Sequence, residues 1–506
     1  MSEKQYLMGI DIGTYESKGT IVDTQGNVLA FAAEKHSMEN PKPNYYEHDA
    51  DQVWWHDLCV LSCRLLEQTG IPKESVAGLG VSTLGTNCLP VDKELKPLRK
   101  AILYGIDARS QKEIEFLTGY YGEEKVKELF GRPICSGDVC AKILWIKNNE
   151  PEIYEKTYKF LTGTSYLVAK LTGKFVVDRF LGIASLRPLY HMDGRIREEM
   201  CPLFCRPDQL PEGRIVTDLA GTITAQAAQA TGLMEGTPVI VGSGDSSSEA
   251  ISTGVIHPGD VMVQFGSSVF IYCCTEQLVT DDRVRGNSFL IPNTYSVAAG
   301  TNNCGTITKW FRDNLYPEAV ALEEAGGPNA YETMMREVEK IPVGSDGLVT
   351  LPYFAGERTP INDPNARGLM IGLRLDHTKH HMYRSALEGV AFSVGQHIDI
   401  LKENGIGPLR IMAVGGGTKN RVWMQMVADV MGEPLNMADV TIGASYGDAL
   451  MAGIGVGIFK DFADLQRVIR PSVTLYPDEQ RHQQYQHYRK IYDEAYLANK
   501  DLMHRL

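Results

Sequence analysis

One pattern occurs twice in this chain of 506 residues: an apolar strand, a turn of small polar residues, and a second apolar strand. The first copy lies within residues 6–32 and reads YLMGIDIG, then GTIVDT, the turn QGN and the strand VLAFAA. The second, GDVMVQFGSSVFIYCCTE, occupies residues 259–276. Apolar runs joined by such turns predict β-hairpins. Two hairpins half a chain apart predict two similar halves, with a boundary near residues 252–258.

The rest of the chain alternates between helical and strand-like patterns. Apolar residues recur at helical spacing in residues 51–70, 142–158 and 380–401. Residues 478–500 are polar and rich in tyrosine and predict a surface helix. A strand, a glycine turn and a helix follow one another in residues 237–255 and again in 409–432. Strands that alternate with helices are typical of α/β folds with largely parallel sheets.

Length and charge exclude several classes of protein. The chain is too long for a single core, so we expect two large domains. It has no run of eighteen apolar residues and no apolar signal region at its N-terminus, so no membrane is predicted and the cytoplasm is the expected location. A formal net charge of −13 argues against nucleic acid as a partner. The ten cysteines form no C-x-x-C pair and predict free, buried thiols.

Three turns could each hold part of a nucleotide. In the first hairpin, Asp11 stands at the end of a strand and is followed by Gly13 and Thr14. A carboxylate in this place can hold Mg²⁺, while the N–H and hydroxyl groups of the turn can meet phosphate oxygens. The alternative is a hairpin whose glycine and threonine only turn the chain.

The second and third turns lie in the other half. Gly266, Ser267 and Ser268 form a turn to which the same two interpretations apply. The third turn, AVGGGTKN, contains Gly415, Gly416 and Gly417 between a strand and a helix, which lets the backbone approach a ligand closely. Asn420 is expected in the first turn of that helix, with an amide suited to a base or a ribose. The alternative is a tight connection between strand and helix.

A carboxylate follows the strand in VIVGSGDSSSEA. Asp245 comes after a Gly-Ser-Gly turn, at the mouth of the predicted sheet, where α/β proteins bind ligands. It could accept a proton from an attacking hydroxyl group. It could also cap the helix that follows, and the two roles do not exclude each other.

Together these segments resemble the FGGY family of carbohydrate kinases, nearly from end to end. The resemblance is carried by GIDIGTYESKG, KILWIKN, GSGDSSSEA, LPYFAGERTP, GLMIGLRLDHTKHHMYRSALEGVAF and GGGTKNRVWMQMVADVMGEPL. The fifth stretch matches the family's second signature throughout. The first signature matches around Lys142 and Trp145, except that Val139 stands where proline, serine or threonine is usual. Within the family the chain is most similar to xylulokinase-like pentulose kinases.

The resemblance implies an α/β fold of two RNase H-like domains, as in actin, Hsp70 and hexokinase, flanking a catalytic cleft. Residues 1–255 would form the domain that binds the sugar and carries the catalytic base. Residues 256–506 would form the nucleotide-binding domain, with a terminal helix able to pack back on the first domain. The resemblance also suggests a homodimer.

The implied activity is ATP-dependent phosphorylation of a hydroxyl group of a small sugar, a ketopentose such as xylulose or ribulose, with Mg-ATP between the two domains. Another ketose or a polyol, such as a tetrulose, erythritol or a glycerol-like compound, is the alternative substrate. An ATP-switch protein like actin or Hsp70 is disfavoured, because Asp245 and LPYFAGERTP match the sugar-kinase branch.

The resemblance also assigns roles to individual residues. Asp245 matches the catalytic base, and Asp11 matches the Mg²⁺-associated aspartate. The residues that match nucleotide-binding positions are Gly13, Thr14 and Lys18 in the first phosphate loop, Gly266 and Ser267 in the second, Gly305 near ATP, and Gly415, Gly416, Gly417 and Asn420 in the nucleotide turn.

The candidate sugar contacts depart from the family pattern. Gly85 and Thr86 replace a contacting pair that is Met-His in xylulokinases and Arg-Glu in glycerol kinases, which leaves the sugar open. Asp107 and Arg109 either contact the sugar or brace the domain, and Trp54 either packs in the core or lies near the sugar.

Two further departures lie in TIGASYGDALMAG. Gly443 stands where glutamate is common, and Asp448 stands where small residues are common. We expect ATP use to survive both changes.

Overall fold

The computed structural model describes residues 5–85 and 87–506, and the chain divides into two compact units. Unit 1 consists of Met1–Gly254, Ser288–Asn293 and Ile442–Ile469, and unit 2 consists of Val255–Asn287, Thr294–Thr441 and Arg470–Leu506. The chain therefore first passes from unit 1 to unit 2 inside the predicted boundary region. Among the described residues, no helix has both the length and the apolar character that crossing a membrane requires.

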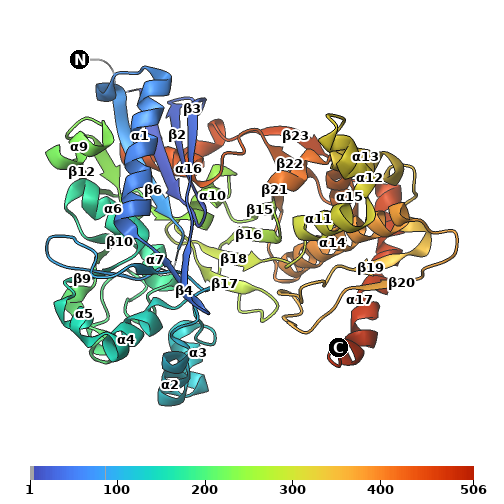
Figure 1. The fold of residues 1–506 in the computed structure, drawn as a ribbon, viewed down its shortest axis with the longest axis horizontal. Coiled ribbons are helices and arrows are strands. Elements are labelled where there is room, and N and C mark those ends of the chain that lie inside the picture. Colours follow the sequence, from blue (N-terminus) through green and yellow to red (C-terminus); the bar gives the residue numbers. More distant parts are fainter. Residues whose placement is uncertain (1–4, 86) are drawn as a thin grey trace. The chain divides into compact units, whose positions relative to one another are not determined.

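The main sheet of unit 1 starts with the predicted hairpin. Its strands are β1 (Tyr6–Ile12), β2 (Glu16–Asp23), β3 (Val28–Lys35), β6 (Val76–Thr83), β12 (Leu219–Thr222), β13 (Pro238–Ile240) and β14 (Ser243–Gly244). β1, β2 and β3 form an antiparallel meander, while β6 runs parallel to β1, and β13 and β14 run parallel to β6. The strand order is β12-β13-β6-β1-β2-β3 (Figure 1).

The main sheet of unit 2 repeats this topology. Its strands are β15 (Asp260–Phe265), β16 (Val269–Thr275), β17 (Arg285–Ser288), β18 (Tyr295–Ala299), β21 (Arg410–Val414), β22 (Leu435–Ala438) and β23 (Pro471–Leu475). Again the first three core strands, β15, β16 and β18, are antiparallel, and β21 and β22 are added in parallel on the other side of β15. The order β3-β2-β1-β6-β13 in unit 1 therefore corresponds, strand for strand, to the order β18-β16-β15-β21-β22 in unit 2. The prediction of two similar α/β halves is confirmed.

The helices and minor strands complete each unit. Unit 1 contains α1 (His56–Thr69), α2 (Gln111–Tyr121), α3 (Glu123–Phe130), α4 (Val139–Asn149), α5 (Pro151–Lys156), α6 (Gly163–Thr172), α7 (Arg179–Ala184), α8 (Cys201–Phe204), α9 (Ala225–Thr231), α10 (Asp245–Ser252), α16 (Ala444–Gly455) and the short strands β4 (Glu39–Lys42), β5 (Tyr45–His48), β7 (Leu89–Val91), β8 (Ala101–Ile102), β9 (Lys159–Leu161), β10 (Val176–Asp178) and β11 (Glu212–Arg214). Unit 2 contains α11 (Gly305–Leu315), α12 (Pro317–Glu324), α13 (Ala330–Val338), α14 (Lys379–Glu403), α15 (Arg421–Met431), α17 (Glu479–Met503), β19 (Val349–Leu351) and β20 (Leu369–Ile371).

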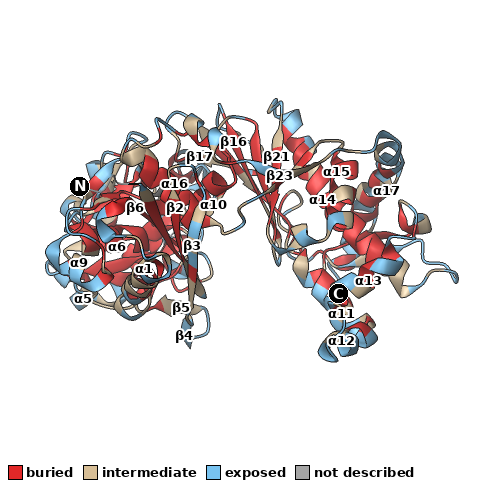
Figure 2. Cartoon of the chain, turned by 90° about the horizontal axis from the view of Figure 1, so that it is seen from above, coloured by how far each residue is buried: buried red, intermediate tan, exposed pale blue. Residues whose placement is uncertain are grey.

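The central strands of both sheets are buried, and Figure 2 shows β6 and β21 largely in red. In unit 1, Met8 and Ile10 of β1 share an apolar core with Leu61 of α1 and Leu167 of α6. Because side chains alternate along a strand, Gly9 and Asp11 face the opposite side of the sheet. That side is covered by α16.

Glycines let α16 lie directly on the sheet. A Cβ atom at Gly9 would lie 1.9 Å from the carbonyl oxygen of Ser445, and one at Gly80 would lie 2.2 Å from that of Asp448. The backbone of α16 therefore touches the backbones of β1 and β6. Two residues further along each strand, on the same face, stand Asp11 and Ser82. The glycines thus bring Asp448 next to both.

The terminal helix α17 packs in unit 2. Its buried tyrosines, Tyr485, Tyr492 and Tyr496, lie on one helical face and belong to the apolar core of unit 2. The ring of Tyr492 lies 6.2 Å from that of Tyr353. The C-terminal segment that joins unit 1 is Ile442–Ile469, which contains α16.

Candidate active site

Three carboxyl groups converge at the carboxyl ends of β1 and β6 in unit 1. Asp11 and Ser82 are direct partners in the parallel pairing of these strands. The hydroxyl oxygen of Ser82 lies 2.9 Å from Oδ1 of Asp11 and 2.6 Å from Oδ2 of Asp448. The third carboxyl group, that of Asp245, raises the pKa of both Asp11 and Asp448 by charge repulsion.

Asp245 is held at the beginning of α10. Gly244 occupies the N-cap position, so Asp245 is the first helical residue rather than the cap. Its Oδ1 accepts a hydrogen bond of 2.7 Å from the backbone N–H of Ser246, and its side chain is half-buried. The short strand β14 precedes it and pairs with β6, which places Asp245 at the same edge of the sheet as Ser82.

Burial makes all three carboxyl groups weaker acids than usual. It raises the pKa of Asp245 to about 6, although N–H groups of Ser246 and Gly85 oppose the shift. It raises the pKa of Asp448 to about 8, with a further contribution from Asp245. The pKa of Asp11 lies well above its usual value, because burial and the two neighbouring carboxyl groups outweigh Ser82 and Lys18. A carboxylate with a pKa near 6 is suited to accept a proton near neutral pH.

The turn between β1 and β2 is tight and polar. The N–H of Gly13 donates to the carbonyl oxygen of Glu16 at 3.2 Å, and a Cβ on Gly13 would lie 2.7 Å from that oxygen. The hydroxyl group of Thr14 lies 3.3 Å from that of Tyr104. Lys18 is the cross-strand partner of Asp11, and its ammonium group lies 3.7 Å from Glu16. The predicted first phosphate loop therefore lies beside the carboxylate cluster.

His36, which the sequence did not reveal as a site residue, contacts the backbone of this turn. His36 Nδ1 lies 2.8 Å from Oδ2 of Asp57, and its Nε2 lies 3.1 Å from the carbonyl oxygen of Gly13. Both partners of the ring are oxygen atoms, so His36 links the Asp57 carboxyl group to the backbone of the turn. Ser17 donates to the same Asp57 oxygen at 2.7 Å. These residues are far apart in the sequence, and no local pattern connects them.

In unit 2, the turn Gly266–Ser267 is clamped by the start of α11. The carbonyl oxygen of Gly266 accepts the N–H of Gly305 at 2.9 Å, and that of Ser267 accepts the N–H of Cys304 at 3.0 Å. A Cβ on Gly305 would lie 2.7 Å from the Gly266 oxygen. Gly305 is thus explained by the close approach of the two segments.

The three glycines of the turn between β21 and α15 have different environments. Gly415 has a φ of +92°, and a Cβ on it would lie 2.7 Å from the carbonyl oxygen of Phe265. A Cβ on Gly417 would lie 2.7 Å from the Cβ of Phe265, whereas one on Gly416 would meet nothing within 4 Å. Gly416 therefore leaves a stretch of backbone that a ligand can approach.

Asn420 caps α15 instead of standing inside its first turn. Its Oδ1 accepts the N–H of Trp423 at 3.0 Å. The capping bond uses the carbonyl oxygen of the side chain and not its NH₂ group.

The candidate sugar contacts behave differently from one another. Trp54 is fully buried and donates its indole N–H to Nδ1 of His48 at 3.0 Å, as expected for core packing. Asp107 accepts hydrogen bonds of 2.7–3.0 Å from Nε and Nη2 of buried Arg109, which corresponds to the bracing interpretation. Gly85 lies at the end of β6 beside Asp245, and Thr86 lies outside the described residues.

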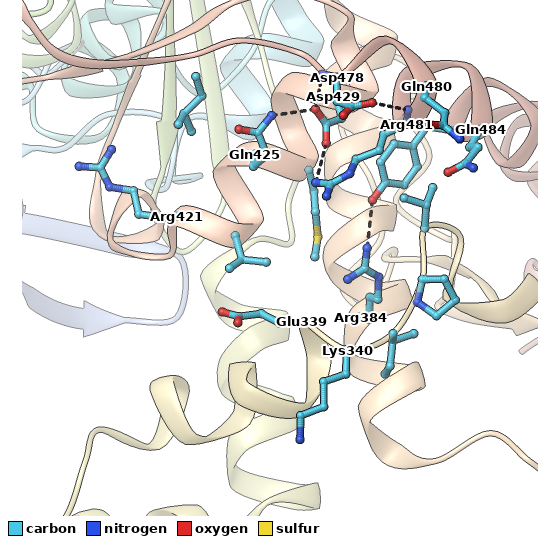
Figure 3. Close-up of a pocket in the computed structure, with 17 residues that line it drawn as sticks. Glu339, Lys340, Arg384, Arg421, Gln425, Asp429, Asp478, Gln480, Arg481 and Gln484 are labelled. Atoms are coloured by element: carbon cyan, nitrogen blue, oxygen red, sulfur yellow. Dashed lines mark hydrogen bonds and ion pairs between the residues drawn. The ribbon is translucent and has the colours of Figure 1, made fainter.

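A cavity of about 830 Å³ in unit 2 is formed between the end of α13, α15 and the start of α17. Its polar side chains bind one another: Asp429 accepts hydrogen bonds from Gln425 and from the N–H of Asp478, and lies 3.7 Å from Arg481 (Figure 3). Its described lining includes none of the predicted site residues.

Two units share one topology, one with carboxyl groups at its strand ends and one with clamped glycine turns, and family and structure matches place this arrangement among the two-domain carbohydrate kinases. Residues 6–252 match the N-terminal domain of the FGGY family of carbohydrate kinases, and residues 261–456 match its C-terminal domain. The chain belongs to the FGGY family of carbohydrate kinases and is a sugar kinase, which confirms the resemblance.

Relatives extend over the full length of the chain. The xylulose kinase of Bacillus subtilis is 27% identical over 98% of both chains, and the gluconokinase of the same organism is 26% identical over 90% of this chain and 87% of its own. The crystal structure of xylulose kinase from Rhodospirillum rubrum matches 99% of this chain and 100% of its own, at 28% identity and a TM-score of 0.88. Glycerol kinase of Plasmodium falciparum, at 20% identity and a TM-score of 0.83 over 97% and 98%, shares the fold.

Proposed function

We propose that the protein phosphorylates a hydroxyl group of a small ketose, a ketopentose such as xylulose or ribulose, with ATP as the phosphoryl donor and Asp245 as the general base. The observation that carries this proposal is the carboxyl group of Asp245 beside Asp11 and Ser82, with a pKa of about 6. The xylulose kinases among the relatives support the sugar class.

In this reaction Asp245 receives the proton of the substrate hydroxyl group. The hydroxyl oxygen forms a bond to the γ-phosphorus, the bond from that phosphorus to the bridging oxygen of ADP breaks, and ADP leaves with the electron pair. Hydrogen bonds donated by the backbone N–H groups of Ser246 and Gly85 hold the carboxylate of Asp245 in place and keep it ionised at neutral pH. The chain's contribution is mostly positioning and electrostatics.

The residues around Asp11 fit a Mg²⁺ ion that arrives with the nucleotide. Among the described residues, no three acidic, histidine or cysteine side chains are arranged as a complete metal site. Mg²⁺ commonly takes only one or two carboxylates and completes its shell with waters and phosphate oxygens. Asp11, oriented by Ser82, would supply such a ligand. When bound, the ion would neutralise negative charge on the phosphate oxygens.

The nucleotide would be held by turns of both sequence repeats. In unit 1, these are Gly13, Thr14 and Lys18. In unit 2, the clamped turn at Gly266 and Ser267, the open backbone at Gly416 and the amide of Asn420 supply groups suited to phosphate, ribose or base. We therefore assign sugar binding and the catalytic base to unit 1, and most of the nucleotide contacts to unit 2.

The sugar itself is less narrowly defined. Gly85 lies next to Asp245 and offers no side chain where xylulokinases carry a Met-His pair. A small residue there leaves room for a ketose other than xylulose. Other ketoses and polyols are therefore candidates beside the ketopentoses.

The test is an ADP-release assay with Mg-ATP and a panel of ketopentoses, other ketoses, polyols and gluconate. We expect at least one ketose to raise ADP formation well above the rate without sugar, and a sugar phosphate to form in equal amount. If no sugar raises ADP release, the proposal is wrong. Size-exclusion chromatography of the same protein tests the predicted homodimer.

A further inference from the structure

Residues 355–359, Ala-Gly-Glu-Arg-Thr, belong to the stretch LPYFAGERTP that supports the family resemblance, but none of them is part of the candidate site. This AGERT segment lies in unit 2, beside the loop of residues 300–303 that connects β18 to α11. The amide NH₂ group of Asn302 donates to the carbonyl oxygen of Ala355 at 3.2 Å. The beginning of the AGERT segment is therefore bonded to the loop.

Two buried side chains of the AGERT segment bind the backbone of this loop. Oε1 of Glu357 accepts the N–H of Asn302 at 2.8 Å. The hydroxyl oxygen of Thr359 accepts the N–H of Gly300 at 2.8 Å and lies 3.0 Å from Nε2 of His397, which is also buried. A buried N–H group without a partner is costly, so these bonds fix the path of the loop.

Arg358 connects the same loop to the strand that follows the second phosphate turn. Its Nη2 donates to the carbonyl oxygen of Thr301 at 2.8 Å and to that of Val269 at 3.2 Å. Val269 is the first residue of β16, directly after the turn. A Cβ on Gly300 would lie 2.1 Å from the carbonyl oxygen of Val269, so the loop also touches the backbone of β16.

The loop leads directly into the groups that clamp the turn. Gly305, at the start of α11, donates its N–H to the carbonyl oxygen of Gly266 at 2.9 Å. The backbone N–H and the hydroxyl group of Thr306 both donate to the carbonyl oxygen of Ser267 at 3.1 Å. Hydrogen bonds thus run from the AGERT segment through the loop and the start of α11 to the turn.

We propose that the AGERT segment supports the second phosphate turn, and that Thr359 is a positioning residue for the nucleotide. By fixing Gly300, Thr359 keeps the start of α11 where it orients Gly266 and Ser267. The proposal rests on the proposed function, in which this turn holds phosphate. A site that is formed in only a fraction of the molecules loses affinity in proportion to that fraction, so a supported turn binds the nucleotide more tightly.

The test removes the hydroxyl group of Thr359 while keeping the shape of the side chain. Thr359→Val leaves the N–H of Gly300 without its partner, and we expect the Kd for Mg-ADP, measured by calorimetric titration, to rise by about 10-fold. The KM for ATP should rise in parallel, whereas the KM for the sugar should change much less, because sugar binding is assigned to unit 1. Thr359→Ser retains the hydroxyl group and should bind Mg-ADP nearly as the wild type does.

Thr350→Val is the matched control. Thr350 is also fully buried in unit 2, and its hydroxyl group lies 2.6 Å from that of Ser385, away from the loop. Both valine variants should lower the thermal midpoint, since each loses a buried hydrogen bond. Only Thr359→Val should weaken the binding of Mg-ADP.

A double variant tests whether Thr359 acts through the start of α11. Gly305→Ala alone displaces the clamp, because its Cβ would lie 2.7 Å from the carbonyl oxygen of Gly266. The Gly305→Ala/Thr359→Val double variant should therefore bind Mg-ADP as Gly305→Ala does, without an additive loss.

The proposal is overturned if Thr359→Val binds Mg-ADP like the wild type, if Thr359→Ser binds no better than Thr359→Val, if Thr350→Val weakens binding equally, or if the double variant is additive. Titration with Mg-ADP requires no turnover. A wild type that binds Mg-ADP but phosphorylates no sugar would contradict the proposed function and leave this comparison standing. A wild type that does not bind Mg-ADP would overturn both.

Discussion

The two units share a strand order but differ at the end of their first strand. Asp11 is the penultimate residue of β1, and its partner on the parallel strand is Ser82. The penultimate residue of β15 is Gln264, and its partner on the parallel strand is Val414. The same place in the topology therefore holds a carboxylate with a hydroxyl group in one unit, and an amide opposite an apolar side chain in the other.

The turns that follow β1 and β15 also have different surroundings. In unit 1 the turn after β1 lies beside carboxyl groups, and the carbonyl oxygen of Gly13 lies 3.1 Å from Nε2 of His36. In unit 2 the turn after β15 is held by backbone hydrogen bonds from the start of α11. The same topology thus carries carboxyl groups at its strand ends in one unit and a turn held by backbone hydrogen bonds in the other.

Substitutions at the penultimate positions of β1 and β15 should give the largest difference in kcat between the two units. Asp11→Asn removes the charge that would hold the cation, and we expect a fall in kcat of about 100-fold to 1000-fold, typical of lost electrostatic stabilisation. Gln264→Ala, its matched control in unit 2, should change kcat by less than about 3-fold. Steady-state kinetics at saturating Mg-ATP measures both. Equal losses in the two variants would show that the units do not divide the work as proposed.

The acidic cluster of unit 1 should also set the pH dependence of the reaction. Asp245 must be ionised to accept a proton, and its pKa is raised to about 6. The rate should therefore be constant above that pH and fall about 10-fold per pH unit below it. A pH profile of kcat/KM for the sugar tests this, with Mg-ADP binding measured in parallel. A rate that stays level down to pH 4.5 would contradict the role of Asp245.

Much of this difference could be predicted from the sequence, but only where the signal is local. The two hairpins, the glycine turns and Asp245 after its strand are all visible as short patterns, and the structure has them as expected. Asn420 differs by one position, because the helix begins after it and its side chain serves as the cap.

The parts that could not be predicted depend on contacts between distant segments. Asp448 was visible only as an unusual residue, since nothing in the sequence reveals that α16 returns to unit 1 and lies on Gly9 and Gly80. The link from His36 to Asp57 and Gly13 is of the same kind. For α17, the sequence predicted a tyrosine-rich surface helix, whereas Tyr485, Tyr492 and Tyr496 are buried in the core of unit 2.

The glycines of unit 2 offer the smallest and most selective effect. Gly416→Ala adds a methyl group where the structure leaves open space, so stability should be unchanged while the KM for ATP rises by about 10-fold. Gly417→Ala forces a methyl group against Phe265 and should destabilise unit 2 by about 1–3 kcal/mol. Thermal unfolding together with ATP kinetics separates the two outcomes. If Gly416→Ala leaves the KM for ATP unchanged, that turn does not approach the nucleotide.

The most direct measurement of the central claim is the sugar-dependent rate of ADP formation by Asp245→Asn, at saturating Mg-ATP and with the best sugar of the panel. The control is Asp23→Asn. Asp23 is the last residue of β2, and its carboxylate accepts hydrogen bonds from the backbone N–H groups of the turn between β2 and β3. We expect Asp245→Asn to lose at least about 100-fold in kcat, the usual contribution of a general base, while it still binds Mg-ADP and unfolds at the wild-type temperature. Asp23→Asn should keep its activity. If Asp245→Asn retained more than about a tenth of the wild-type rate, Asp245 would not be the base.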